Sequence, residues 1–368
     1  MIICCFLIER RMIVSNTFNT INEIKEELRR VTEEEKVKIA FFGQPGAGKS
    51  SLINEIVGEE VSQVSSFTDT TDDAEPYEWN NLVLMDLPGY GTEMFPKETY
   101  WNQFKIDEYD LFLCVLSGKW HDADTEFFNK LKNKGKVCIF VRNQSDNLFD
   151  KRKPIDQIKA EIKVDISLQI HIKTDDFELI FTSCKTGEGI DGLIKKIDDC
   201  LDSSKRECWE RNAKAHSIEF LSKKKEACSK LITLAAGASA LNGLNPVIGT
   251  DIAIDMGIMV NLSKQLQKNY GISDEKLKEM SLLKEYDYVF QIINRVLKYA
   301  STDGINAVLK AVMKNEVPKK IVKIIPFVGQ AISATAGFAL TYYIGKQMRD
   351  DFHTLAESIL KNELDVNA

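Results

Sequence analysis

A glycine-rich octapeptide near the start of the chain has the residues that nucleotide phosphates require. Its residues are Gly43, Gln44, Pro45, Gly46, Ala47, Gly48, Lys49 and Ser50, which fit the pattern G-x-x-x-x-G-K-S. Glycines let successive backbone N–H groups turn toward phosphate oxygens, and the following helix adds the positive end of its dipole. The lysine reaches the β- and γ-phosphates, and the serine hydroxyl binds Mg²⁺. With Ser51 continuing the helix, the octapeptide predicts a Mg²⁺–nucleotide site.

A second motif, D-x-x-G, follows later in the chain at Asp86–Gly89. Its aspartate is placed to hold Mg²⁺ through a water, and Gly89 is placed to offer a backbone N–H to the γ-phosphate. Between the two motifs, Ser65–Asp73 has neither helical nor strand periodicity. Such a segment suits a loop that orders around the metal and the γ-phosphate. Thr71 or Thr70 would supply its hydroxyl ligand to Mg²⁺.

Two further segments predict which base is bound. Asn143-Gln144-Ser145-Asp146 fits N-K-x-D with glutamine in place of lysine. Asp146 can accept hydrogen bonds from both guanine N1–H and the 2-amino group, a donor pair that adenine lacks. We expect Gln144 to weaken stacking on the base and bracing of the loop, and so to lower affinity more than specificity. Ser183-Cys184-Lys185 resembles the S-A-K loop that touches the guanine oxygen. Their order indicates GTP and GDP rather than ATP.

The residue that follows Gly89 is Tyr90, at the position where small signalling GTPases carry a glutamine that orients the attacking water. A phenol cannot present an amide to that water. Either the chain hydrolyses GTP slowly by itself, or the missing group comes from elsewhere, such as a partner subunit. Nucleotide binding without turnover stays open as a third interpretation.

The motifs need strands and helices to position them. Apolar runs of strand length precede each motif, at residues 37–42, 82–85, 137–142 and 179–181. We therefore predict an α/β P-loop GTPase domain over residues 36–203, with a mixed, mostly parallel sheet flanked by helices. From Lys205 the strand pattern stops. Residues 204–368 are predicted to form an all-α part together with an amphipathic helix at 13–35, which follows a tail at 1–12.

Composition excludes several classes of protein. Of the 368 residues 44% are hydrophobic and 28% charged, which is typical of a globular chain and excludes wholesale disorder. A net charge of -7 argues against nucleic acid as a partner and against electrostatic capture by anionic lipid. The eight cysteines form no C-x-x-C pair and the four histidines are isolated. These features predict reduced thiols, a cytoplasmic location and no metal site built from side chains alone.

Three features bear on membranes. Ile324–Gly345 is 22 residues without a charge, long enough to cross a bilayer. Its polar and small residues favour a buried central helix, with membrane insertion as the alternative. A Pro-x-x-Gly turn before a small-residue helix occurs twice, at 246–249 and 326–329, and predicts that the two helices pack together. Cys4 and Cys5 could be S-acylated, unless translation starts at Met12.

The chain resembles the immunity-related, interferon-inducible GTPases (the IRG family), and more broadly the TrmE-Era-type G proteins. The resemblance depends on the octapeptide and on several later segments. They are Asp86–Thr92, Phe95-Pro96, Thr99-Tyr100, Tyr109–Phe112 and Phe140–Arg142. It implies a helical domain built from both chain ends and GTP-dependent assembly into homo-oligomers or with related GTPases. It also implies action at intracellular membranes in cell-autonomous defence.

The resemblance also implies catalytic residues. In the family, dimerisation across the nucleotides promotes hydrolysis, and an acidic residue just before the switch threonine takes part. By register from Pro76-Tyr77 these positions are Asp69 and Thr71, which join Lys49 as the catalytic candidates. The family usually has glutamate at the first position and T-K-x-D as its base motif. Two alternative functions remain: a regulatory GTP-binding protein with negligible turnover, and a G protein inserted in the membrane by a helical hairpin.

Overall fold

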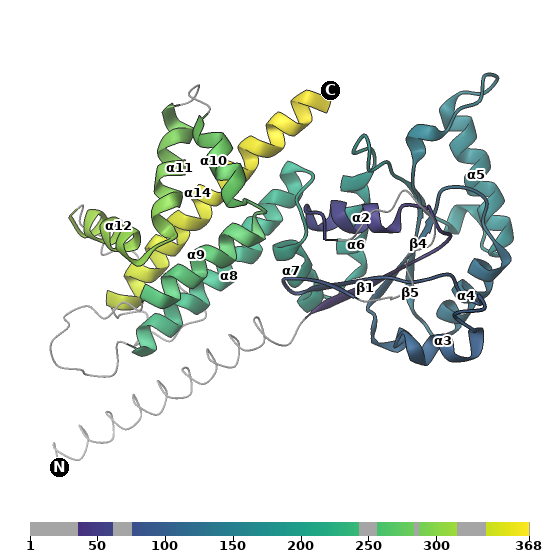
Figure 1. Cartoon of the computed structure of the whole chain (residues 1–368), viewed down its shortest axis with the longest axis horizontal. Coiled ribbons are helices and arrows are strands. Elements are labelled where there is room, and N and C mark those ends of the chain that lie inside the picture. Colours follow the sequence, from purple (N-terminus) through teal and green to yellow (C-terminus); the bar gives the residue numbers. More distant parts are fainter. Residues whose placement is uncertain (1–35, 62–75, 243–255, 283–286, 315–335, 368) are drawn as a thin grey trace, which may run out of the picture. The chain divides into compact units, whose positions relative to one another are not determined.

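The computed structural model describes residues 36–61, 76–242, 256–282, 287–314 and 336–367 (Figure 1). The chain divides into two compact units, one ending at Phe220 and the other running on from Leu221. We describe each unit by itself.

The first unit is built on one six-stranded sheet with the strand order β2-β3-β1-β4-β5-β6. The pairing is parallel except between β2 and β3. The strands are β1 (Val37–Phe42), β2 (Tyr77–Trp79), β3 (Leu82–Asp86), β4 (Leu111–Leu116), β5 (Val137–Arg142) and β6 (Leu179–Phe181). The predicted α/β architecture is confirmed, and each of the four predicted apolar runs is a strand.

Helices cover both faces of this sheet, because successive strand side chains point to opposite faces. In β1, Val37, Ile39 and Phe41 pack in the same apolar cluster as residues of α2, α6 and α7. Ala40 and Phe42 join a second cluster that includes residues of α3, α4 and α5. The helices are α2 (Lys49–Val57), α3 (Lys97–Gln103), α4 (Asp122–Asn133), α5 (Ile155–Gln169), α6 (Ile190–Cys200) and α7 (Ser203–Asn212).

Helix α7 belongs to the sheet unit, which therefore extends past the boundary expected at residue 203. Asp202 caps the helix, since its side chain accepts hydrogen bonds from the backbone N–H groups of Ser204 and Lys205 at 3.1 and 3.0 Å. Cys208 and Trp209 are fully buried in the cluster beneath the sheet. The sequence of α7 is rich in charged residues. Its packing against the sheet was therefore not predicted.

The second unit is helical throughout its described part. Its helices are α8 (Ile218–Asn242, beginning before Leu221), α9 (Met256–Asn269), α10 (Asp274–Leu282), α11 (Asp287–Tyr299), α12 (Thr302–Lys314) and α14 (Ala336–Asn367). A buried cluster joins α11 to α14, because the Asp351 carboxylate accepts bonds from Arg295 and from the Tyr299 hydroxyl. A Cβ on Gly345 would lie 2.7 Å from Ile232 and 3.1 Å from Leu262, so α14 closely approaches both α8 and α9.

Several predictions fall outside the described residues. They concern the tail with Cys4 and Cys5, the helix at 13–35, the loop with Asp69 and Thr71, and both Pro-x-x-Gly turns. Of Ile324–Gly345 only the part from Ala336 is described, as the start of α14, and there Phe338 and Ile344 are buried. Within the described part of the chain, no helix has the length and apolar character that a bilayer crossing needs.

Candidate nucleotide-binding site

The glycine-rich loop joins the end of β1 to the first turn of α2, in the predicted strand–loop–helix arrangement. Gly43 and Gly48 have φ angles of 135° and 88°, which side-chain-bearing residues rarely adopt. A Cβ on Gly43 would lie 1.9 Å from the Val115 carbonyl oxygen, and one on Gly48 would lie 2.2 Å from Asn143 Nδ2. The loop is therefore packed against β4 on one side and against the base motif on the other.

The phosphate motif and the D-x-x-G motif meet at the carboxyl ends of β1 and β3, where Phe41 is in register with Asp86. The Lys49 side chain is buried, and its ammonium donates to the Gly43 carbonyl at 3.1 Å. The same ammonium lies 3.6 Å from Asp86 Oδ1. Ser50 Oγ donates to Asp86 Oδ2 at 2.7 Å. All three predicted phosphate- and metal-binding side chains are thus in mutual contact.

The oxygens at this point fit Mg²⁺. Asp86 Oδ1 is buried and has no hydrogen-bond partner among the described residues. The Lys49 ammonium offsets its charge from 3.6 Å without a hydrogen bond, so the oxygen keeps its lone pairs for a metal ion. With the Ser50 hydroxyl it forms a pair of oxygen donors, and Mg²⁺ prefers few protein oxygens together with phosphate and water. Ser50 and Asp86 are therefore the described residues that would hold the metal beside a nucleotide.

Asn143 ties the base motif to its surroundings on two sides. Its Nδ2 donates to the Ala47 carbonyl at 3.0 Å, and its Oδ1 accepts from Thr182 Oγ1 at 3.1 Å. The Cys184 thiol contacts the same Oδ1 at 3.7 Å, and burial raises the pKa of this thiol to about 12. Asn143 therefore positions loops rather than facing solvent, and the neutral thiol acts as a small packing group.

Gln144 braces the phosphate loop despite replacing the usual lysine. Its backbone is left-handed, with φ of 58°, and its Nε2 donates to the Gly46 carbonyl at 2.9 Å. The expected loss of bracing is therefore not observed. The reason is that an amide donor satisfies the same loop carbonyl that an ammonium would. What glutamine lacks is the lysine's charge.

Asp146 is oriented by the loop that follows β6. Ser183 Oγ donates to Asp146 Oδ1 at 2.7 Å, and the exposed Lys185 ammonium lies 4.0 Å from Oδ2. The Asp146 side chain is only 16% exposed. The two segments predicted to recognise guanine therefore lie together, and the carboxylate is held by a neutral hydroxyl and a distant cation.

Tyr90 lies in the aromatic core and points away from the predicted phosphate site. Its ring is 7% exposed and packs on Tyr100 and Phe127, with ring centroids 5.1 and 4.9 Å away. Its hydroxyl contacts Glu126 Oε1 at 3.3 Å and the Lys130 ammonium of α4. The Lys130 hydrogen bond to this hydroxyl raises the pKa of the ammonium. Tyr90 therefore anchors the segment after Gly89 and does not orient water.

Asp124, which the sequence motifs do not reveal, lies beside the phosphate loop. It is buried at the start of α4, and its Oδ2 accepts a 2.5 Å hydrogen bond from Gln44 Nε2. Burial raises the pKa of this carboxyl, although the hydrogen bond from Gln44 opposes the shift. Because the Gln44 carbonyl lies 3.4 Å from the Lys49 ammonium, Asp124 supports the loop segment that holds this lysine.

A second contact that the motifs did not reveal supports the base loop. Ser145 Oγ donates to Glu188 Oε2 at 2.9 Å, and Lys159 on α5 lies 2.7 Å from Glu188 Oε1. Both hydrogen bonds lower the pKa of Glu188 and keep it ionised. Glu188 has no sequence signature, since its role depends on the Thr186–Gly189 turn that brings it under Ser145.

The remaining predicted residues divide into two groups. The loop itself contains Pro45, Gly46, Ala47 and Gly48. Ser51 lies in the first turn of α2, and Gly89 follows β3. Asp69 and Thr71 lie outside the described residues, so their roles stay predictions. The described site thus brings together the glycine-rich loop, the Ser50–Asp86 oxygen pair and the two segments predicted to recognise guanine, at the carboxyl ends of parallel strands.

Comparisons with known proteins agree with this site. The family model for the interferon-inducible GTPases (IIGP) matches residues 4–336. The interferon-gamma-inducible GTPase 10 of Mus musculus is 23% identical over 90% of this chain and 82% of its own length. Interferon-inducible GTPase 1 of Mus musculus is 30% identical over 42% of this chain and 41% of its own length. Among solved structures, Toc33 of Arabidopsis thaliana with GDP and Mg²⁺ is 14% identical, covering 54% of this chain and 94% of its own, with a TM-score of 0.34.

The fold and the site together define a P-loop GTPase, an enzyme that hydrolyses GTP. Because the family model matches nearly the whole chain, the protein belongs to the interferon-inducible GTPase family.

Proposed function

We propose that this protein binds GTP with Mg²⁺ at the site described above, hydrolyses it to GDP and phosphate, and assembles with itself in the GTP-bound form. Lys49 and the backbone N–H groups of the loop would stabilise the charge that grows on the phosphoryl oxygens. Ser50 and Asp86 would hold Mg²⁺, and Asp146 would select guanine. Asn143, Ser183, Cys184 and Lys185 would shape the base pocket.

The observation that supports assembly is the position of Tyr90. The side chain at the position of the water-orienting residue is buried and hydrogen-bonded on the far side of its segment. The group that activates the attacking water must then come from another part of this chain or from a second molecule. The family resemblance names Asp69, with Thr71 as its neighbour and as a Mg²⁺ ligand. We propose that Asp69 acts across an interface between two nucleotide-bound copies.

GTP turnover measured against protein concentration tests this proposal. If a second copy supplies the activating group, turnover per molecule rises with concentration, and Asp69→Ala removes the rise. Asp175→Ala, which removes an exposed carboxylate outside the catalytic candidates, should keep the rise. If Asp69→Ala keeps the concentration-dependent rate, another residue activates the attacking water.

Tyr90 also favours a second candidate function, a regulatory GTP-binding protein with negligible turnover that holds other GTPases inactive. In that case tight GTP binding is accompanied by a rate that stays near zero at all concentrations. The same titration therefore separates the two functions, because only the first predicts a rising rate.

The site of action is proposed from the family alone. We propose that the protein acts in the cytoplasm and at intracellular membranes in cell-autonomous defence; the names of its interferon-inducible relatives support only the link to immunity. Membrane insertion by a helical hairpin is the alternative, and carbonate extraction separates the two. Recovery of the protein in the soluble fraction after extraction contradicts insertion, whereas retention in the pellet contradicts peripheral binding.

A further inference from the structure

An exposed phenylalanine projects from the loop that follows the base motif. Phe149 is 79% exposed, the highest value among the large apolar side chains of the described residues. Asp150 follows it and is also exposed. Burying one aromatic side chain stabilises an interface more than burying most other residue types. We call Phe149 and Asp150 the tip.

Hydrogen bonds from backbone N–H groups flank the Phe149 side chain on both sides. Asp150 Oδ1 accepts a 2.8 Å hydrogen bond from the Arg152 backbone N–H, and the Leu148 N–H donates to the Ser145 carbonyl at 3.1 Å. Lys153 fastens the other end of the loop through a 2.6 Å ion pair with Glu161 on α5. A preordered loop loses little conformational entropy on binding. The Asp150 Oδ2 oxygen has no such bond in the described part of the chain.

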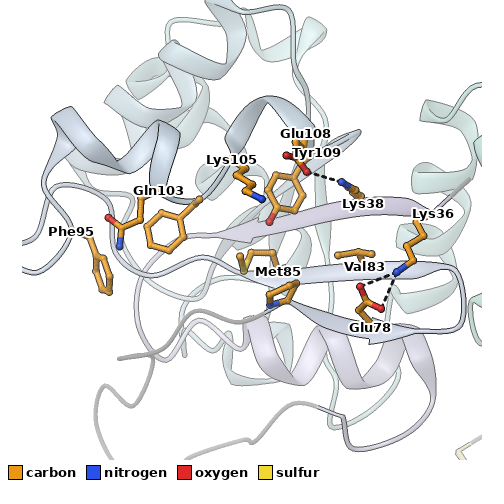
Figure 2. A pocket seen from close by; sticks show the side chains of 12 residues that line it. Lys36, Lys38, Glu78, Val83, Met85, Phe95, Gln103, Lys105, Glu108 and Tyr109 are labelled. Carbon is orange, nitrogen blue, oxygen red and sulfur yellow. Dashed lines mark hydrogen bonds and ion pairs between the residues drawn. The ribbon is translucent and has the colours of Figure 1, made fainter. Parts of the chain in front are cut away.

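A pocket of about 510 Å³ lies elsewhere in the same unit, where β1, β2 and β3 meet α3 and the turn after it (Figure 2). Its apolar lining includes Val83, Met85, Phe95 and Phe104. Three of these side chains are at most 7% exposed, and Phe95 is half-buried. The volume lies within the range of about 300–1,000 Å³ in which proteins bind ligand-sized groups.

The rim of the pocket has one cation more than its anions can neutralise. Lys36 pairs with Glu78 at 2.9 Å and Lys38 pairs with Glu108 at 2.7 Å, and both pairs are drawn in Figure 2. Lys105 lines the same pocket, and among the described residues it forms no ion pair. An apolar floor with one unneutralised cation fits an aromatic group that carries a neighbouring carboxylate.

We propose that the tip of one copy of the chain inserts into this pocket of a second copy. Phe149 packs on Val83, Met85 and Phe104, and the Asp150 carboxylate pairs with Lys105. The contact joins two different surfaces, so each copy keeps one free tip and one free pocket, and assembly continues as an open chain. This inference rests on the proposed self-assembly and adds a second interface to the contact across the nucleotides.

The place of the pocket connects this contact to the nucleotide. Phe95 lies shortly after the D-x-x-G motif, and Pro76, which also lines the pocket, follows the loop predicted to order around the γ-phosphate. Both walls are therefore continuous with the segments that GTP is expected to position. Docking in this pocket would depend on GTP without any direct contact between the tip and the nucleotide.

Sedimentation velocity of the full chain with Mg²⁺ and a non-hydrolysable GTP analogue tests the proposal. The unmodified protein should form species larger than dimers as its concentration rises. Phe149→Ala and Lys105→Glu should each weaken association roughly tenfold or more, because each damages one half of the contact. Mixing these two variants should restore assemblies larger than dimers, since one supplies intact pockets, the other supplies intact tips, and the contact across the nucleotides joins copies of each. The charge exchange Lys105→Glu with Asp150→Lys should restore long assemblies.

Controls separate this interface from folding and from the proposed function. Leu168→Ala removes another strongly exposed apolar side chain, and Lys132→Glu reverses another exposed lysine, and both should assemble normally. Every variant should bind the analogue as the unmodified protein does. A mixture whose assemblies are no larger than those of the single variants contradicts the tip-in-pocket contact. Unimpaired assembly of both single variants overturns this inference and leaves self-assembly intact, whereas failure of the unmodified protein to assemble overturns both.

Discussion

The phosphate end and the base end of the nucleotide site are built in opposite ways. At the phosphate end a buried ammonium and a buried carboxylate have few partners, since Lys49 contacts backbone carbonyls and Asp86 Oδ1 has no hydrogen bond. At the base end nearly every side chain is already bonded to another, as for Asn143 and Ser183. The phosphate end thus keeps its binding capacity for a charged ligand, whereas the base end is ordered in advance.

Among the variants that test this comparison, replacing Lys49 should change GTP affinity most. Lys49→Ala deletes the only buried cation among the described residues of the phosphate end, so we expect GTP affinity to fall roughly 100-fold or more. Calorimetric titration with GTP and Mg²⁺ measures the loss, with Lys132→Ala as an exposed control. Equal affinity in the two variants would mean that the phosphate end does not depend on buried charge.

Changing the base-reading carboxylate should have the next largest effect and should change selectivity. In Asp146→Asn the side chain presents a donor where guanine also presents donors, and xanthine presents a carbonyl there instead. Charge-assisted hydrogen bonds contribute about 1.5–3 kcal/mol, so the preference for GTP over xanthosine triphosphate should change by about 10- to 100-fold. Competition binding measures the ratio, and an unchanged ratio contradicts the assignment of Asp146.

A variant at Gln144 tests how much the ordered base end supports the glycine-rich loop in binding GTP. Gln144→Ala removes the 2.9 Å bond to the Gly46 carbonyl, a neutral hydrogen bond that is worth about 1 kcal/mol. GTP affinity should fall about fivefold, and the preference over xanthosine triphosphate should stay the same. Gln169→Ala on α5 is the matched control. A selectivity change as large as that of Asp146→Asn would show that the two ends are not separable.

The smallest effect is expected at Asp124, which supports the phosphate end from behind. Burial raises the pKa of this carboxyl in the folded state. The folded protein therefore holds the proton more tightly than the unfolded chain, and ionisation costs stability as pH rises above the ordinary range near 3.9. Asp124→Asn can still accept from Gln44 and should be more stable than the unmodified protein at pH 7. Urea unfolding at several pH values should show the difference shrinking toward pH 4.

How far the sequence predicts this site depends on where the contacts come from. Lys49, Ser50 and Asp86 were predicted because glycine spacing and strand order place them, and backbone geometry enforces that order. Asp124 and Glu188 were missed because each meets its partner through a helix or turn that no motif marks. The buried contacts of Tyr90 were missed for the same reason, since α4 brings Glu126 and Lys130 to it from 36 and 40 positions away.

The fold shows the same division. Apolar runs predicted four of the strands, because local chemistry decides these features. The attachment of α7 to the sheet unit is not local. The charged residues of Ser203–Asn212 indicate its solvent face, whereas the apolar packing comes from Cys208 and Trp209.

The buried ring of Tyr90 limits how far the segment after Gly89 moves. Tyr90, the first residue after Gly89, is held by the aromatic core, and Pro88 just before Gly89 accepts a 2.6 Å hydrogen bond from the Tyr100 hydroxyl, so Gly89 has little freedom to move on its phosphate side. A displacement at Gly89 is then transmitted as a tilt of Tyr90 against α3 and α4. The state of the bound nucleotide would therefore be transmitted through small rigid-body movements of α3 and α4, with little unfolding of the loop itself.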